Sequence, residues 1–141
     1  MLKNFSKKNE RESSINKNVL IIALLIHAAK IDENYTKNEK TIIKKVIMDL
    51  NKISSNQANE LLKLAAKKEG ESNQIIEFTK EIKKYSMEFK LKIVEIIWKI
   101  VYSDGTSDDY ESNLIRRICG LLYISDKDNG IIKAKVQNLL R

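Results

Sequence analysis

Proline is absent from this sequence of 141 residues, which has only four glycines, one cysteine and one histidine. β-Sandwiches and barrels need many turns rich in proline and glycine, so the composition argues against both. A single cysteine cannot form an intramolecular disulfide, which excludes a secreted disulfide scaffold and favours a reducing cytoplasm. One cysteine and one histidine also cannot supply the four ligands of a structural zinc site. The length fits one domain better than two.

Long hydrophobic runs are lacking too. The longest, Val19 to Ile26, is far shorter than the ~20 residues that a membrane-spanning helix needs. Residues 28–30 make a poor signal-peptide cleavage site, because more helix-forming sequence follows them. We therefore expect a cytoplasmic protein that is not integral to a membrane, with peripheral contact left open. We predict that residues 1–17 form a basic, partly disordered tail and that residues 18–141 form a single domain.

The formal net charge of +7 invites a nucleic-acid or anionic-membrane interpretation. Two features weaken it. The lysine, isoleucine and asparagine content is typical of an AT-rich genome, and only four of the 26 basic residues are arginine, the side chain preferred for bidentate phosphate recognition. The charge is also uneven, since residues 102–130 carry a net charge of −3. This basic protein therefore has an acidic patch.

Apolar residues recur every three or four positions along nearly the whole chain, which is the helical period. The spacing predicts an all-α, single-domain bundle of about seven helices. The predicted helices cover residues 16–31, 37–51, 55–69, 73–85, 87–103, 109–123 and 127–140. Between Ser86 and Ser103 the polar residues other than Lys90 (Glu88, Lys92, Glu95 and Lys99) fall on one narrow face, so we expect this helix to be central.

Helix starts are well marked. Three segments have capping-box spacing or its aspartate variant: Thr36 to Glu39, Ser54 to Gln57 and Asp108 to Glu111. Further N-cap candidates are Ser72, Ser86 and either Ser125 or Asp126. Gly70 is predicted to end a helix, because glycine is favoured just past a helix C-terminus.

A weak internal duplication appears when the sequence is shifted by 72 residues. The shift places Asp32 on Asp104, Thr36 on Asp108, Glu39 on Glu111, Ile43 on Ile115, and Ser54 on Asp126. Each unit then consists of a helix, an acidic loop, a second helix and the start of a third. The shared loop, cap and apolar stripe favour an ancient duplication over chance.

The acidic loops resemble the signature of TerB-like proteins, a family named from bacterial tellurite resistance. The second loop, residues 102–122 (YSDGTSDDYESNLIRRICGLL), matches its pattern of a helix end, Asp-Gly, a short loop, a glutamate and an apolar helix. Residues 27–39 (HAAKIDENYTKNE) resemble a first copy, except that Glu33 replaces the expected glycine. The resemblance covers roughly residues 18–140 and is greatest to the stand-alone TerB-like proteins of proteobacteria. It implies an all-α bundle of about seven helices.

The resemblance also implies divalent-metal binding by the loop acids, which are Asp32 and Glu39 in the first unit and Asp104, Asp108 and Glu111 in the second. Carboxylate oxygens suit calcium or magnesium. Helix capping explains the same spacing with no ion, because the aspartates can bind loop N–H groups and the glutamates can complete capping boxes. Both interpretations stay open here, and capping is favoured.

No catalytic constellation is evident. His27 has no partner acid at a suggestive spacing, so we place it at the edge of the core or on a solvated face. Cys119 and Trp98 are expected in the core. Gly-rich phosphate loops and hydrolase or zinc-protease motifs are absent from the sequence. We therefore expect no enzyme.

These observations favour a non-enzymatic TerB-like module that binds a protein partner in a stress or tellurite response. Its expected cofactor, if the loop acids bind a metal, is calcium or magnesium. The alternative is a binder of nucleic acid or anionic membrane surfaces. It would use the basic tail and the lysine cluster, which we define as Lys80, Lys83, Lys84 and Lys90. Nucleic acid is the less favoured partner, because interleaved arginines and aromatics are absent.

Overall fold

The computed structural model describes residues 18–30, 37–71, 75–104 and 109–139. In this part the chain forms seven α-helices and no strand, which confirms the predicted all-α bundle. The first helix is described over residues 18–29. The others are α2 (Lys37–Asn51), α3 (Ser55–Glu71), α4 (Ile75–Ile82), α5 (Met87–Val101), α6 (Asp109–Leu121) and α7 (Asp126–Leu139), with a 3₁₀ turn, η1 (Tyr102–Asp104), after α5. The predicted tail, residues 1–17, lies outside the described residues.

Three of the predicted helix caps are present. Ser54 and Gln57 form a complete capping box, because each backbone N–H donates to the other residue's side chain, at 3.1 and 3.2 Å. The Ser86 hydroxyl accepts from the N–H of Phe89, and that of Ser125 from the N–H of Asp128. These side chains satisfy N–H groups that have no partner inside their helices. The remaining candidates, Thr36, Ser72 and Asp108, lie outside the described residues.

The C-terminal ends of α3, α4, α5 and α6 differ from the prediction, and α5 and α6 each end two residues early, at Val101 and Leu121. Gly70 does not end α3, which continues to Glu71 with Gly70 in a normal helical conformation. A glycine near a helix end was therefore a misleading signal at this position. Helix α4 ends at Ile82, three residues early, because Lys84 and Tyr85 donate to Glu81 and Ile82 in tight i to i+3 turns.

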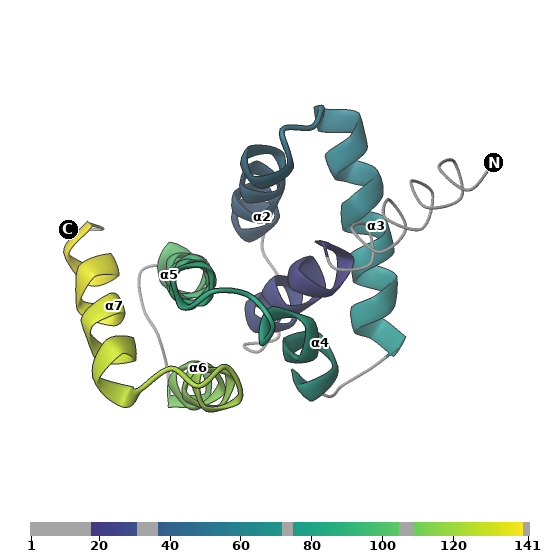
Figure 1. Ribbon diagram of the computed structural model, residues 1–141. Helices are drawn as coiled ribbons and strands as arrows, with labels where there is room; N and C mark the ends of the chain where they lie inside the picture. The colour runs from purple at the N-terminus through teal and green to yellow at the C-terminus, as the bar shows by residue number, and fades with distance from the viewer. Residues whose placement is uncertain (1–17, 31–36, 72–74, 105–108, 140–141) are drawn as a thin grey trace.

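Helix α5 is central, as its apolar sequence predicts. It contacts α2, α6 and α7, and Figure 1 shows α2 above it, α6 below it and α7 to its left. Its residues Ile93, Val94, Ile97, Trp98 and Ile100 are buried. The core continues into the first helix, whose residues 21–26 are all buried. Burying this many large apolar side chains is the main stabilising contribution to the fold.

The helix order supports the internal duplication. A shift of 72 residues places the first helix on α5, α2 on α6 and α3 on α7, with α4 connecting the two units. Equivalent positions share their burial, since Ile43 and Ile115 are both fully buried. The third helices are offset by one residue, because α7 is capped by Ser125 and not by Asp126, the residue aligned with Ser54.

None of the described helices is both long enough and apolar enough to cross a membrane.

Candidate functional site

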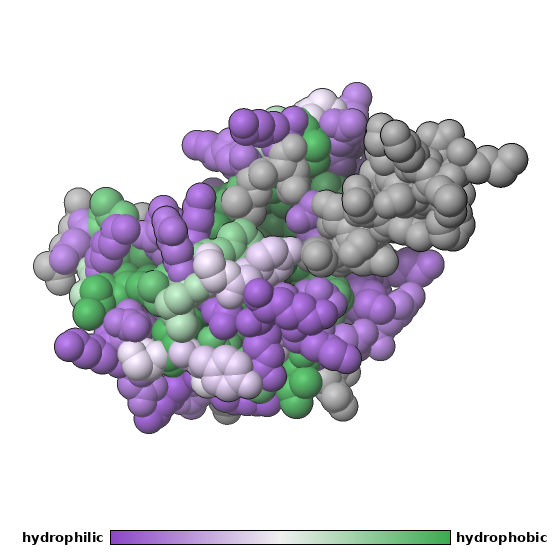
Figure 2. Space-filling view, viewed as in Figure 1, coloured by the Kyte–Doolittle hydropathy of each residue, from purple (hydrophilic) through white to green (hydrophobic). Residues whose placement is uncertain are grey.

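An open groove of about 550 Å³ lies between α2 and α7, beside α5. Its apolar lining consists of Ile42 and Val46 from α2 together with Val136 and Leu139 from α7. Leu139 is 63% exposed, although a side chain of this size and type is normally buried. Figure 2 shows apolar surface, in green, over α7 at the left of the view, with hydrophilic atoms beside it. We call this feature the α2–α7 groove.

Polar contacts between side chains hold α7, the outer wall of the groove, against α5 and η1. Val136 is the one buried residue of α7. The indole N–H of Trp98 donates to Oδ1 of Asn129 over 2.9 Å, and Nε2 of Gln137 donates to the Tyr102 hydroxyl over 2.7 Å. Such contacts are directional, so they orient α7 more specifically than apolar packing alone would.

Glu95, one turn before Lys99 in α5, is paired with a lysine of α7. The ammonium of Lys135 lies 2.7 Å from Oε1 of Glu95, and this hydrogen bond holds the pKa of Glu95 below its usual range despite partial burial. The sequence predicted that Glu95 lies on one narrow polar face of this helix together with Lys99. Its close partner comes instead from α7, which no spacing within α5 could reveal.

Positive charge is therefore left beside the groove. Lys45 and Lys99 line it, and neither has a salt-bridge partner among the described residues. The lining has one acidic residue, Asp49. The groove thus combines apolar walls with a net positive rim, which favours binding a segment that is apolar on one side and acidic on the other.

Two of the five predicted metal ligands, Glu39 and Glu111, have described side chains. They occupy equivalent positions in the first turns of α2 and α6, are 4% and 5% exposed, and both have an interaction partner. Asp32 and Asp108 lie outside the described residues, as does the side chain of Asp104. Among the described side chains, no three of His, Cys, Asp and Glu are grouped to hold a metal ion.

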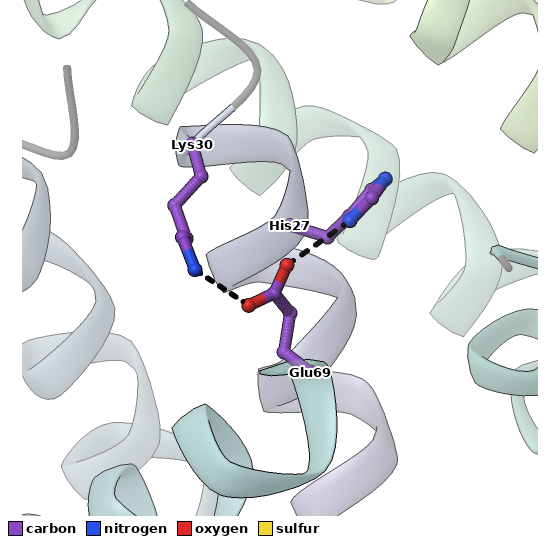
Figure 3. A network of polar contacts seen from close by, with 3 residues as sticks. All are labelled: His27, Lys30 and Glu69. Carbon is purple, nitrogen blue, oxygen red and sulfur yellow. Dashed lines mark hydrogen bonds and ion pairs between the residues drawn. The ribbon is translucent and has the colours of Figure 1, made fainter. Parts of the chain in front are cut away.

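A polar network that the sequence did not reveal joins the first helix to α3 (Figure 3). The buried carboxylate of Glu69 receives the Lys30 ammonium at 2.8 Å and lies 3.3 Å from Nδ1 of His27. His27 is half-buried, as expected for the edge of the core, but it does have a partner acid. One feature of the sequence could have indicated this network. Glu69 comes four residues after Ala65, which is buried, so both residues lie on the inner face of α3.

The lysine cluster does not form one continuous charged surface. Lys84 is paired with Glu81 at 3.3 Å, and Lys90 is largely buried. Lys83 and Lys90 both lie against the ring of Tyr123, from the connection between α6 and α7. Tyr123 was not among the aromatics that the sequence singled out.

The predictions for Cys119 and Trp98 are correct, since both side chains are buried in the core. Burial, with a smaller contribution from the charge of Asp126, raises the pKa of the Cys119 thiol to about 12. A thiol with that pKa stays protonated at neutral pH and is a poor nucleophile. Cys119 is therefore a structural residue.

One protein family matches the chain. The sequence model described as tellurite resistance protein TerB covers residues 18–134, which include all of the described helices except the end of α7. Searches of curated proteins and of solved structures gave no significant match. The seven-helix architecture, the repeated acidic-loop pattern and this match agree with one another, and the chain belongs to the TerB family.

Proposed function

We propose that this TerB-family protein is a non-enzymatic interaction module that binds an acidic, amphipathic helix of a partner protein in the α2–α7 groove. The observation that carries the proposal is the pairing of apolar walls with the two lysines, Lys45 and Lys99, that lack a salt bridge within the described residues. A helix laid into an apolar groove is a common mode of peptide recognition. The family's name connects the interaction with a tellurite or stress response, and the cytoplasm is the compartment we assign to it.

The charge of the groove selects among occupants. An acidic helix would pair with Lys45 and Lys99 while its apolar side covers Ile42, Val46 and Leu139. The chain's own N-terminal segment, residues 1–17, is basic and would be repelled by the same lysines. A second copy that docked through its own α2–α7 groove would bring another positive rim against the first. An acidic partner segment is therefore the favoured occupant.

Photo-crosslinking in cells tests this proposal directly. A benzoylphenylalanine at position 139, which is exposed in the groove, should crosslink to a partner peptide that is amphipathic and rich in aspartate and glutamate. The double variant Lys45→Glu and Lys99→Glu should lose the crosslink, because it reverses the charge of the rim. Mass spectrometry of the crosslinked peptide provides the measurement.

Two controls match these changes. Leu64 is an exposed apolar residue of α3 that does not line the groove, so a crosslinker there should not capture the same peptide. Lys63→Glu with Lys67→Glu makes the same charge change on exposed positions of α3. The proposal fails if crosslinks lead to a basic or uncharged segment, to residues 1–17 or to a second copy. It also fails if the control pair Lys63→Glu and Lys67→Glu reduces the crosslink from position 139 as much as Lys45→Glu and Lys99→Glu do.

The acidic loops give a second proposal, that calcium or magnesium binds there through Asp32, Glu39, Asp104, Asp108 and Glu111. Its support is that the two described acids, Glu39 and Glu111, are buried at equivalent positions of the repeat. Each also has an interaction partner within the protein, and such pairing accounts for a buried carboxylate without an ion. Capping of α2 and α6 by the same residues is the competing explanation.

Titration calorimetry separates the two explanations of the acidic loops. Calcium, magnesium and zinc are titrated into the wild type, Asp104→Ala and the control Asp126→Asn, whose exposed acid begins α7. Metal binding predicts heat from calcium or magnesium that Asp104→Ala removes and Asp126→Asn keeps. Capping predicts no heat from any ion.

A further inference from the structure

We propose that Lys83, Lys90 and Tyr123 form a binding site for a phosphate group, carried by a small phosphate ester or by a lipid headgroup. The ammonium groups of Lys83 and Lys90 lie 5.3 and 5.6 Å from the centroid of the Tyr123 ring. They come from different elements, because Lys83 follows α4 and Lys90 belongs to α5. The tertiary fold thus gathers two cations around one aromatic ring.

The backbone of Tyr123 is unusual. Its φ of 62° is in the left-handed region, which a bulky residue rarely adopts and where glycine is the usual choice. The residue lies two positions past the end of α6, and the N–H of Ile124 closes the helix end by donating to the carbonyl of Cys119 over 2.8 Å. This turn would form more easily with glycine, yet the chain has a tyrosine whose side chain is 68% exposed. Lys52, just past the end of α2, has a similar φ of 51°, so the left-handed backbone itself serves to end a helix. What distinguishes Tyr123 is its exposed ring beside two lysines.

Neither ammonium group is neutralised by the part of the chain that the structure describes. Lys83 and Lys90 have no salt bridge there, whereas the neighbouring Lys84 is paired with Glu81. Lys90 is only 7% exposed, and lysines this buried normally have an anionic partner. No fully buried side-chain nitrogen or oxygen among the described residues lacks a hydrogen bond, so the unbonded ammonium of Lys90 still reaches solvent. A ligand can therefore contact it.

The chemistry of the three side chains points to phosphate. Lysine acts as a point charge on phosphate groups, and two of them match the double charge of a phosphate monoester. The tyrosine adds a hydroxyl donor and a ring that restrains both lysine side chains by cation–π attraction. Restraining the donors before binding lowers the entropy that the complex loses. The site is too small to follow a nucleic-acid strand, which requires a groove with several stacked aromatics.

Titration of inorganic phosphate, followed by NMR of the full-length chain, tests the site. Amide shifts should be centred on Tyr123 and its neighbours in α4 and α5. Lys83→Ala and Lys90→Met should each weaken binding roughly tenfold, as expected for loss of one charge-assisted hydrogen bond. Tyr123→Gly fits the left-handed backbone, so it should remain folded by circular dichroism and still lose affinity. Lys84→Ala removes the same charge from the paired neighbour and should leave affinity within about twofold.

Further arms distinguish the source of the phosphate and the competing explanations. Binding of glycerol phosphate is compared with binding of vesicles that contain phosphatidic acid. If either ligand binds the wild type and is lost in the Lys83 and Lys90 variants, the result supports the site and identifies the source of the phosphate group. Absence of shifts with phosphate at millimolar concentration overturns the proposal. An equal loss in Lys84→Ala also overturns it, because that result indicates a diffuse charged surface. Binding of single-stranded DNA without any phosphate response assigns the lysines to nucleic acid and contradicts the proposal.

Discussion

Glu69 and His27 are 42 positions apart in the sequence, yet Oε1 of Glu69 lies 3.3 Å from Nδ1 of His27. The other carboxylate oxygen receives the ammonium of Lys30, so one buried carboxylate joins α3 to the C-terminal end of the first helix (Figure 3). A buried carboxylate is costly unless it is paired and hydrogen-bonded. The pairing therefore helps to determine how the first unit of the repeat is assembled.

Replacing Glu69 by alanine should lower the free energy of unfolding by about 2 kcal/mol, because it removes a charge-assisted hydrogen bond from two side chains at a buried site. Urea denaturation followed by circular dichroism measures the change. Glu60→Ala, at an exposed position of the same helix, is the control and should change stability by less than about 0.5 kcal/mol. Equal effects of the two substitutions would show that the network contributes nothing specific.

Asn129→Ala should destabilise the protein by about 1–3 kcal/mol, because it leaves the buried indole N–H of Trp98 without its acceptor. Trp98 is the only tryptophan, so its fluorescence reports on the site and should change in the folded state of this variant. Asn138→Ala, an exposed substitution on the same helix, should alter neither stability nor emission. Unchanged fluorescence in Asn129→Ala would contradict the hydrogen bond.

The ion pair between Glu95 and Lys135 should make stability depend on pH in the acidic range. The hydrogen bond from Lys135 lowers the pKa of Glu95 in the folded state, so the pair contributes fully above the unfolded pKa and is lost as the pH falls through the folded pKa. Glu95→Gln should therefore cost about 0.5–1 kcal/mol at pH 7, the range for partly exposed pairs, and the difference from wild type should shrink in acid. Glu88→Gln, exposed on the same helix, should show no such trend.

Cys119 should not react with a thiol reagent in the folded protein at pH 8, because burial raises its pKa to about 12 and also blocks access. Unfolding in guanidinium should make the reaction fast, which a colorimetric thiol assay measures. The raised pKa also means that the thiol's contribution to stability is complete below the unfolded pKa and is lost as the pH rises toward 12. Rapid labelling under native conditions would place Cys119 at the surface.

The sequence predicted the helices because their causes are local. Apolar spacing determines which residues can form a buried stripe. The hydroxyls of Ser54, Ser86 and Ser125 accept hydrogen bonds from N–H groups in the first turns of the helices that follow them. Capping was more reliable than glycine as an indicator of helix ends. Gly70 lies inside α3 because the helix preference against glycine is worth only about 1 kcal/mol, which is too little to end a helix by itself.

The candidate sites depended on contacts between distant segments. The predicted metal-binding acids came from the resemblance to TerB-like proteins, and two of them, Glu39 and Glu111, are buried at equivalent positions. The α2–α7 groove could not be predicted, because its walls come from opposite ends of the domain. The contact of Lys83 and Lys90 with the Tyr123 ring could not be predicted either, because the orientation of Tyr123 depends on the turn after α6.

By itself, therefore, the absence of proline and scarcity of glycine, together with the helical apolar period, determined an all-α bundle. That fold class follows from interactions within a few turns of one helix. Only the tertiary structure decided which polar side chains meet, such as Glu69 with His27 and Glu95 with Lys135. Such pairs depend on how helices pack, and the periodicity of a single helix carries no information about the face of its neighbour.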